Sequence, residues 1–68
     1  MRLIRLPEVI HLTGYKRTAL YKKIDQGDFP RPVKLGPRAV AWIENEVMNW
    51  IKEKIQTRDS NQMELMKG

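Results

Sequence analysis

The stretch from Thr13 to Trp42 constrains the fold of this chain more than any other part of the sequence. A short basic segment of helical character is followed by a bend that contains Pro30 and Pro32, and then by a second basic segment around Gly36-Pro37. The order of a helix and then a basic hairpin is typical of proteins that place a helix in a DNA major groove and a ribbon along the neighbouring backbone or minor groove. The stretch therefore predicts a mainly α-helical, winged helix-turn-helix domain with a small β-hairpin wing.

The composition of the chain limits its size, its means of stabilisation and the kind of partner that it can bind. With 68 residues the chain can form one small domain, and the 41% of apolar residues and two tryptophans are enough for a thin core. It contains no cysteine, so neither a disulfide nor a cysteine-based zinc site can add stability, which fits a cytosolic protein. A net charge of +5 favours a polyanionic partner, either nucleic acid or an acidic membrane face. Because the apolar runs are far too short for a bilayer span and no signal-peptide pattern appears, we expect a cytoplasmic protein with no membrane partner.

Two helices are expected before the bend. The segment 2–6 alternates polar and apolar residues and predicts either a short edge strand or an extended lead-in. Pro7 suits the first position of a helix that Gly14 ends. A second helix is predicted from Lys16 or Arg17 to Gln26, with Gly27 directly after it. Its buried side would carry Leu20 and Ile24.

The basic segment after the bend predicts a hairpin, and the remainder predicts a third helix. Phe29 is the expected apolar anchor of the bend, and the strands are expected at 33–35 and 38–42 with Gly36-Pro37 in the turn. Lys34 would point outward, while the inner face of the hairpin would carry Val33, Leu35, Val40 and Trp42.

The third helix is expected from Glu44 to about Thr57, because apolar residues recur there at helical spacing: Val47, Trp50, Ile51 and Ile55. We expect both tryptophans to pack in the core rather than to stack on bases. These elements predict a DNA-binding domain over residues 1–57 and a flexible tail over residues 58–68.

Eleven residues are candidates for contact with DNA. With Leu20 and Ile24 facing inward, the start of the second helix would offer Arg17 to guanine, and Thr18 and Ala19 to a thymine methyl group. Tyr15 would lie on the outer side of this helix together with Thr18, Ala19, Lys22 and Gln26. Lys22, Lys23 and the hydroxyl of Tyr21 suit phosphates, although packing is an equal alternative for Tyr21. Arg38 in the wing would enter a narrow minor groove. The full candidate set is Tyr15, Lys16, Arg17, Thr18, Ala19, Tyr21, Lys22, Lys23, Arg31, Lys34 and Arg38.

Catalysis and cofactor binding are not expected. His11 is the only histidine, and it has no cysteine or second histidine with which to hold a metal. The sequence carries no Gly-rich nucleotide-binding fingerprint, phosphate-binding loop or nucleophile elbow. We therefore predict a binding protein without enzymatic activity.

Three segments resemble a known family. LTGYKRTALYKKI from Leu12 to Ile24, GDFPRPVKLG from Gly27 to Gly36 and RAVAW from Arg38 to Trp42 closely resemble the AlpA family of prophage and genomic-island regulators, which have a MerR-like, excisionase-like winged-helix fold. The chain departs from the family pattern at two positions. Lys16 stands where family members often carry a serine that can cap the helix. Pro37 is less usual in the wing turn and stiffens it.

The resemblance implies a function that the residues alone do not show. It implies a transcriptional regulator of a nearby integrase gene, a recombination directionality factor (excisionase), or both. The implied partners are double-stranded DNA, an integrase, and further copies of the same chain on adjacent DNA sites. The implied location is the nucleoid in the cytoplasm of a bacterium. Two alternatives stay open: a transcription factor with no role in recombination, and an interaction module whose basic face holds an acidic protein such as an integrase or a response regulator.

Overall fold

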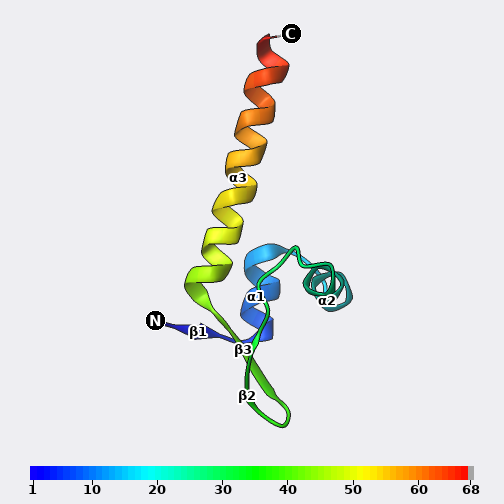
Figure 1. The fold of residues 1–68 in the computed structure, drawn as a ribbon, viewed down its shortest axis with the longest axis vertical. Coiled ribbons are helices and arrows are strands. Elements are labelled where there is room, and N and C mark those ends of the chain that lie inside the picture. The colour runs from blue at the N-terminus through cyan, green and yellow to red at the C-terminus, as the bar shows by residue number, and fades with distance from the viewer. Residues whose placement is uncertain (68) are drawn as a thin grey trace.

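The computed structural model describes residues 1–67, with the side chains described as far as Ser60. The elements follow in the order β1 (Leu3–Ile4), α1 (Leu6–Thr13), α2 (Arg17–Asp25), β2 (Val33–Gly36), β3 (Ala39–Ile43) and α3 (Glu44–Lys67). The hairpin of β2 and β3 and the helix α3 extend in opposite directions from a centre that holds α1 and α2 (Figure 1). Three helices with a small antiparallel sheet and a protruding hairpin confirm the predicted winged helix-turn-helix.

Helix α1 begins and ends with local signals in the sequence. It starts at Leu6, one residue earlier than expected, so that Pro7 occupies the second helical position. A proline is tolerated throughout this first turn because the N–H groups there have no partner inside the helix. At the other end Gly14 adopts the left-handed conformation, with φ of 76°, and its N–H donates to the carbonyl of Ile10 at 2.8 Å.

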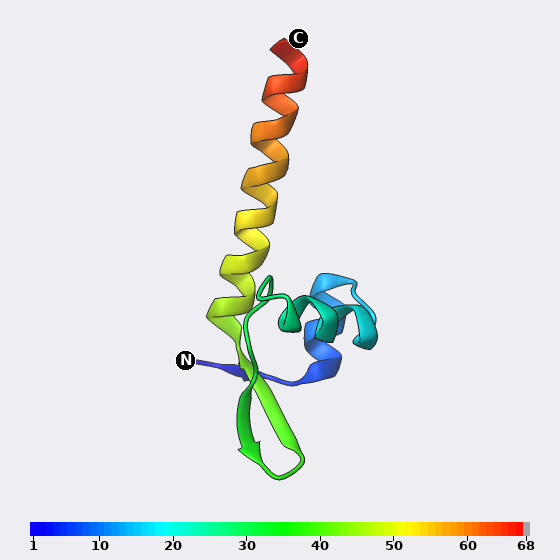
Figure 2. The ribbon, with the colours of Figure 1, turned by 45° about the vertical axis from the view of Figure 1, so that its right-hand side comes forward.

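Helix α2 is the second helix of the predicted pair, and it lies across α1 (Figure 2). It begins at Arg17, after Lys16, whose side chain makes no capping hydrogen bond, as expected for a lysine at that position. Gly27 follows the helix with φ of 79° and lets the chain turn into the bend. Leu20 and Ile24 are buried, which confirms the predicted inner side of this helix.

The sheet brings the segment near the amino terminus next to the central strand β3. Its strand order is β1-β3-β2, and both pairings are antiparallel. The first strand pairs Leu3 with Ile43 and Ile4 with Trp42, so the segment near the amino terminus is an edge strand rather than an unpaired lead-in. Trp42 donates its indole N–H to the carbonyl of Pro30 at 3.0 Å and so ties the bend to the central strand. The core cluster consists of Ile4, Val9, Leu20, Ile24, Phe29, Trp42 and Val47.

The face of the hairpin differs from the prediction. The two turn residues are Pro37 and Arg38, and the pairing pattern shifts between Lys34 and Gly36. As a result Lys34 stands opposite Val40, and the side chains of both lie on the same face of the hairpin as Trp42.

Two expected inner residues therefore lie outside the core. Val33 is 39% exposed and Leu35 is 50% exposed, so the predicted inner face was wrong for both of them. Val33 pairs with Ala41 on the other face, and Leu35 falls where the pairing pattern shifts. The tip of the hairpin protrudes from the centre of the fold (Figure 1).

Helix α3 also differs from the prediction. It begins at Glu44 as expected, but it runs to Lys67 instead of ending near Thr57. No glycine or proline occurs between residues 44 and 67, so the backbone meets no local signal that would stop a helix. Val47 is buried and Trp50 is half-buried, whereas Ile55 is 42% exposed. The division into a domain of residues 1–57 and a flexible tail stays a prediction.

Candidate nucleic-acid interface

The excess of basic over acidic residues lies in the helix-turn-helix and the hairpin. Residues 9–43 contain seven Lys and Arg and only two acidic residues, Asp25 and Asp28. The remainder of the chain contains six basic and six acidic residues. The whole net charge of +5 therefore belongs to the part of the fold that comprises α1 after its first turn, α2 and the hairpin. A field of one sign over a compact surface attracts polyanions to that surface.

Helix α2 presents its first turn to solvent. Leu20 and Ile24 are held in the core, and Thr18, Ala19 and Lys22 lie on the other side of the helix, where they are exposed. Lys16 and Arg17 at the start of the helix are exposed as well. Thr18 and Ala19 are small, so the helix can approach another surface closely at these two positions. This is the arrangement that the sequence predicted for the start of a recognition helix.

Tyr21 contacts two other side chains, one in the core and one at the surface. Its half-buried ring packs edge-on against Trp42, with the ring centroids 6.4 Å apart. The guanidinium carbon of Arg17 lies 5.9 Å from the centre of the same ring. Tyr21 therefore packs on Trp42 and also contacts Arg17, while its contact with a phosphate stays a prediction. Lys23, by contrast, is half-buried.

Tyr15 is separated from the other candidates. It lies in the turn between α1 and α2 rather than on α2, and its N–H donates to the hydroxyl of Thr13 at 3.2 Å. Its half-buried ring packs against Trp50 of α3, with the centroids 6.0 Å apart. The expected place on the outer side of the second helix was therefore wrong for this residue. Tyr15 instead lines a groove beside α3 together with Leu12 and Ile55.

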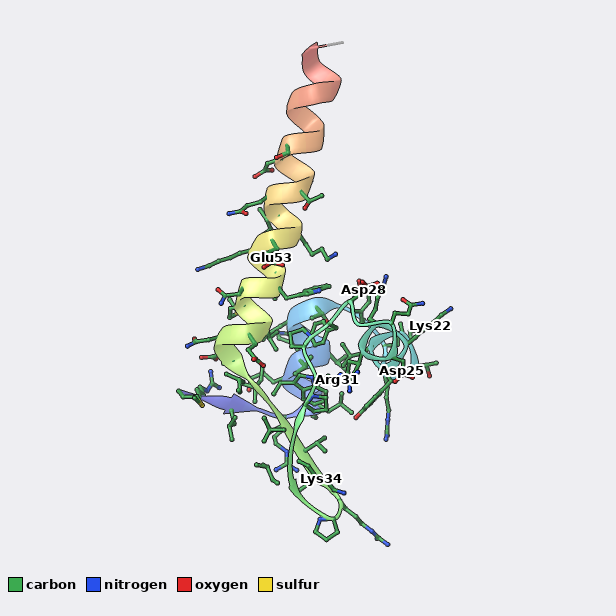
Figure 3. The ribbon with its side chains drawn as sticks, in the orientation of Figure 1. Lys22, Asp25, Asp28, Arg31, Lys34 and Glu53 are labelled. Atoms are coloured by element: carbon green, nitrogen blue, oxygen red, sulfur yellow. The ribbon has the colours of Figure 1, made fainter. Side chains whose placement is uncertain are left out.

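The hairpin and the bend before it contribute three exposed cations, Arg31, Lys34 and Arg38. Lys22 extends from the side of α2 that faces away from α3, and Lys34 extends from the hairpin (Figure 3). The register places Lys34 on the same face of the hairpin as Val40, and Trp42 on that face touches Tyr21 of α2. Cations from α2 and from the hairpin are thus brought to neighbouring parts of one surface.

One basic residue at this surface was missed from the sequence. Arg5 immediately precedes α1, and its side chain lines a cleft that Arg17 and Arg38 also line. A lone arginine before a helix carries no signal of its own, since charged residues commonly occupy such positions. Only the folded arrangement brings it beside two arginines that lie far away in the sequence.

The interface combines small exposed residues with cations from several segments. Among the side chains that the structure describes, no group of three or more His, Cys, Asp or Glu residues is placed to hold a metal ion. None of the described helices combines the length and the apolar character that a bilayer span requires. The interface itself consists of the exposed start of α2, which carries small residues, and of cations from two other segments next to it. This arrangement can bind a large anionic surface through several separated contacts.

Comparison with known proteins gives two close matches and one family. Residues 2–55 match the family model described as Prophage CP4-57 regulatory protein (AlpA). The chain is 44% identical over 57 residues to the uncharacterized protein ORF88 of Enterobacteria phage P4, a match that covers 84% of this chain and 65% of that protein. It is 33% identical over 60 residues to the DNA-binding transcriptional activator AlpA of Escherichia coli (strain K12), covering 79% of this chain and 86% of that protein. The chain thus matches just under two thirds of the length of the phage P4 relative.

Proposed function

This chain belongs to the AlpA family of prophage regulatory proteins, and from that premise we propose that it is a sequence-specific DNA-binding regulator of a mobile genetic element. The observation that carries the proposal is the concentration of seven cations against two acids in residues 9–43, around an exposed helix start. The transcriptional activator of Escherichia coli, whose name states that it binds DNA, supports the same activity here. Such a regulator acts on DNA in the bacterial cytoplasm.

The binding mode follows from the placement of the cations. The first turn of α2 enters the major groove, where Thr18 and Ala19 meet base edges and the thymine methyl group. Lys22 and Lys34, on two separate elements, bind phosphates on the flanks and fix the protein in register without reading sequence. The hairpin then follows the backbone away from the groove. Specificity from so few base contacts requires several protomers on adjacent sites.

A finer role in recombination is part of the proposal. The resemblance to AlpA-like regulators suggests that the sites lie beside an integrase gene or an attachment sequence. There the protein would regulate integrase expression, act as an excisionase, or do both. An excisionase performs no chemistry itself, since it bends the DNA and recruits the integrase. Bending would bring more phosphate to the cations of the hairpin.

We propose that protomers bound to adjacent DNA sites contact one another through α3. The groove beside this helix carries exposed apolar side chains, among them Leu12 at 38% and Ile55 at 42%, and the helix continues beyond the DNA-binding part of the fold. A neighbouring protomer on the next DNA site would cover these side chains. Deleting residues 58–68 should then weaken cooperative binding to two sites and leave the affinity for one site unchanged. An equal loss in both assays would argue against a role for this segment.

The first experiment is to capture sheared DNA from the source genome with the purified protein at physiological salt and to sequence what is retained. Repeated sites beside an integrase gene or attachment sequence are the expected result. Sites at promoters alone would leave a transcription factor without a recombination role. Uniform retention, or none, would contradict sequence-specific recognition and would direct attention to an acidic protein partner for the basic face.

Two classes of variant test the binding mode on a captured site. Thr18→Ala should lower discrimination between the site and random DNA by about 1 kcal/mol, at the low end for a base contact. Lys34→Ala should weaken binding to both kinds of DNA equally and reduce the slope of log K against log salt by about 0.9. Both side chains are exposed, so neither change disturbs the core. Unchanged binding in both variants would refute the helix-plus-hairpin mode.

A further inference from the structure

Three arginines from three separate parts of the chain line one cleft. The cleft has a volume of about 530 Å³ and lies where the start of α1, the helix α2 and the hairpin meet. Its lining includes Arg5 and Pro7 before and in α1, Arg17 and Tyr21 in α2, and Arg38 and Val40 in the hairpin. No acidic residue contributes to this lining.

These three guanidinium groups have no carboxylate partner among the described side chains. The ion pairs of that part of the chain join Arg2 to Glu8, Arg2 to Glu44, and Arg58 to Asp59. Glu8 is the acidic residue closest in sequence to Arg5, and it is held by Arg2 at 3.0 Å instead. The cleft therefore collects positive charge that the protein itself does not neutralise. Such a cluster binds an anion better than any one of its members does, because each guanidinium adds to the field at the same point.

The chemistry of the cleft indicates what kind of anion fits. Guanidinium groups present paired N–H donors that match the oxygens of a phosphate, and they remain charged at any physiological pH. Two N–H groups in the first turn of α1 are already used in hydrogen bonds within the protein. The N–H groups of Glu8 and Val9 in its first turn both donate to the carbonyl of Arg5, each at 3.1 Å. The ligand would therefore be held by side chains. The ring of Tyr21, packed on Trp42, keeps Arg17 at the cleft.

We propose that this cleft binds one phosphate of the DNA backbone, at the point where the strand passes from the groove that α2 enters to the hairpin, with Arg5 as a DNA-binding residue. The proposal rests on the DNA-binding function proposed above. It gives Arg17 a role in holding the backbone, in place of the guanine contact expected from its position at the start of the helix. Because α1, α2 and the hairpin each contribute one arginine, a single phosphate fixes their relative positions on the duplex.

The test uses Arg5→Ala in the full chain, with Arg58→Ala as the matched control. Arg5 makes no capping hydrogen bond with its side chain, so its removal takes away a charge without removing a helix cap. Arg58 is exposed on α3 and pairs with Asp59, which is also exposed. Circular dichroism establishes that both variants are folded. Binding is then measured by fluorescence anisotropy over a series of KCl concentrations, with a random-sequence duplex long enough for one protomer only, so that the contacts between protomers proposed for residues 58–68 do not contribute.

Arg5→Ala should weaken binding to random-sequence DNA, and the slope of log K against log salt should become shallower by up to about 0.9, the value for one phosphate. Arg58→Ala should match the unmodified protein. The double variant Arg5→Ala/Arg38→Ala should lose less affinity than the sum of the two single losses, because both arginines hold the same phosphate. An Arg5→Ala variant that binds like the control, or single losses that add fully, would overturn the proposal.

Two further arms separate the possible failures. Inorganic phosphate is titrated without DNA and followed through the NMR signal of the Arg5 guanidinium. Saturable phosphate binding, together with DNA binding that Arg5→Ala leaves unchanged, would show a site for free anions and overturn the assignment to the DNA backbone. The random-sequence duplex keeps the test independent of sequence-specific recognition. If the protein shows no sequence preference but Arg5→Ala still weakens its binding to DNA, the result would support the phosphate cleft and contradict the proposed sequence-specific regulatory function.

Discussion

Replacing Gly14 by alanine tests whether the turn of the helix-turn-helix depends on a left-handed residue. Gly14 has φ of 76° and ψ of −1°, and a Cβ atom added there would meet nothing within 4 Å. Any destabilisation must therefore come from the backbone conformation and not from a clash. The left-handed conformation costs a residue with a side chain about 1–2 kcal/mol. Alanine also restricts the unfolded chain, which returns about 0.4–1 kcal/mol of stability.

Gly36→Ala supplies the matched control. Gly36 has no positive φ, and a Cβ atom added there would lie 4.0 Å from that of Ala39, an ordinary contact. The same restriction of the unfolded chain should make this variant more stable by about 0.4–1 kcal/mol. Because the unfolded-state effect is common to both substitutions, the difference between them isolates the left-handed cost. That difference should be about 1–2 kcal/mol, with Gly14→Ala the less stable.

Thermal unfolding followed by circular dichroism measures the difference. For a domain of this size 1 kcal/mol corresponds to about 4–8 °C in Tm, so the two variants should differ by about 4–16 °C. Gly14→Asn should fall between them, because asparagine tolerates the left-handed region better than alanine. Equal Tm values for Gly14→Ala and Gly36→Ala would refute the argument that the conformation of Gly14 holds the turn.

Three further predictions concern the core and the long helix. Leu20→Ala should cost about 2–5 kcal/mol in urea unfolding, because Leu20 is fully buried in the seam between α2 and the rest of the core; a loss below about 1 kcal/mol would show that the seam is loosely packed. Val47→Ala should lower Tm clearly and Ile55→Ala should barely change it, because Val47 is buried and Ile55 is 42% exposed. Similar shifts in Tm for the two variants would mean that α3 packs against the domain along more of its length. Trp42→Phe should cost about 1–3 kcal/mol in the same assay, because it leaves the carbonyl of Pro30 without its donor, and an unchanged stability would mean that water replaces the bond.

The local signals of the sequence determined the elements of this fold. Gly14 and Gly27 ended their helices where the backbone needs a positive φ, and no other residue type adopts that conformation as readily. Leu20 and Ile24, four residues apart, marked the buried side of α2 and so also its exposed side. These features depend on the chemistry of single residues and on helical spacing, which can be read without a structure.

Other features depended on how the elements meet. The register of the hairpin placed Lys34 beside Val40 and exposed Val33, because a turn shifted by one residue reverses the faces of a strand. Tyr15 turned toward Trp50 because α3 passes beside the turn, a contact between residues far apart in sequence.

The cleft at Arg5 also depends on how the helices and the hairpin pack together. The sequence determined that the chain carries an excess of cations in residues 9–43 and an exposed helix start to present them. Only the tertiary structure decided that Arg5, Arg17 and Arg38 share one cleft while Glu8 is held by Arg2. The physical reason is that charge and helical spacing are properties of the chain, whereas convergence of side chains from three elements is a property of their packing.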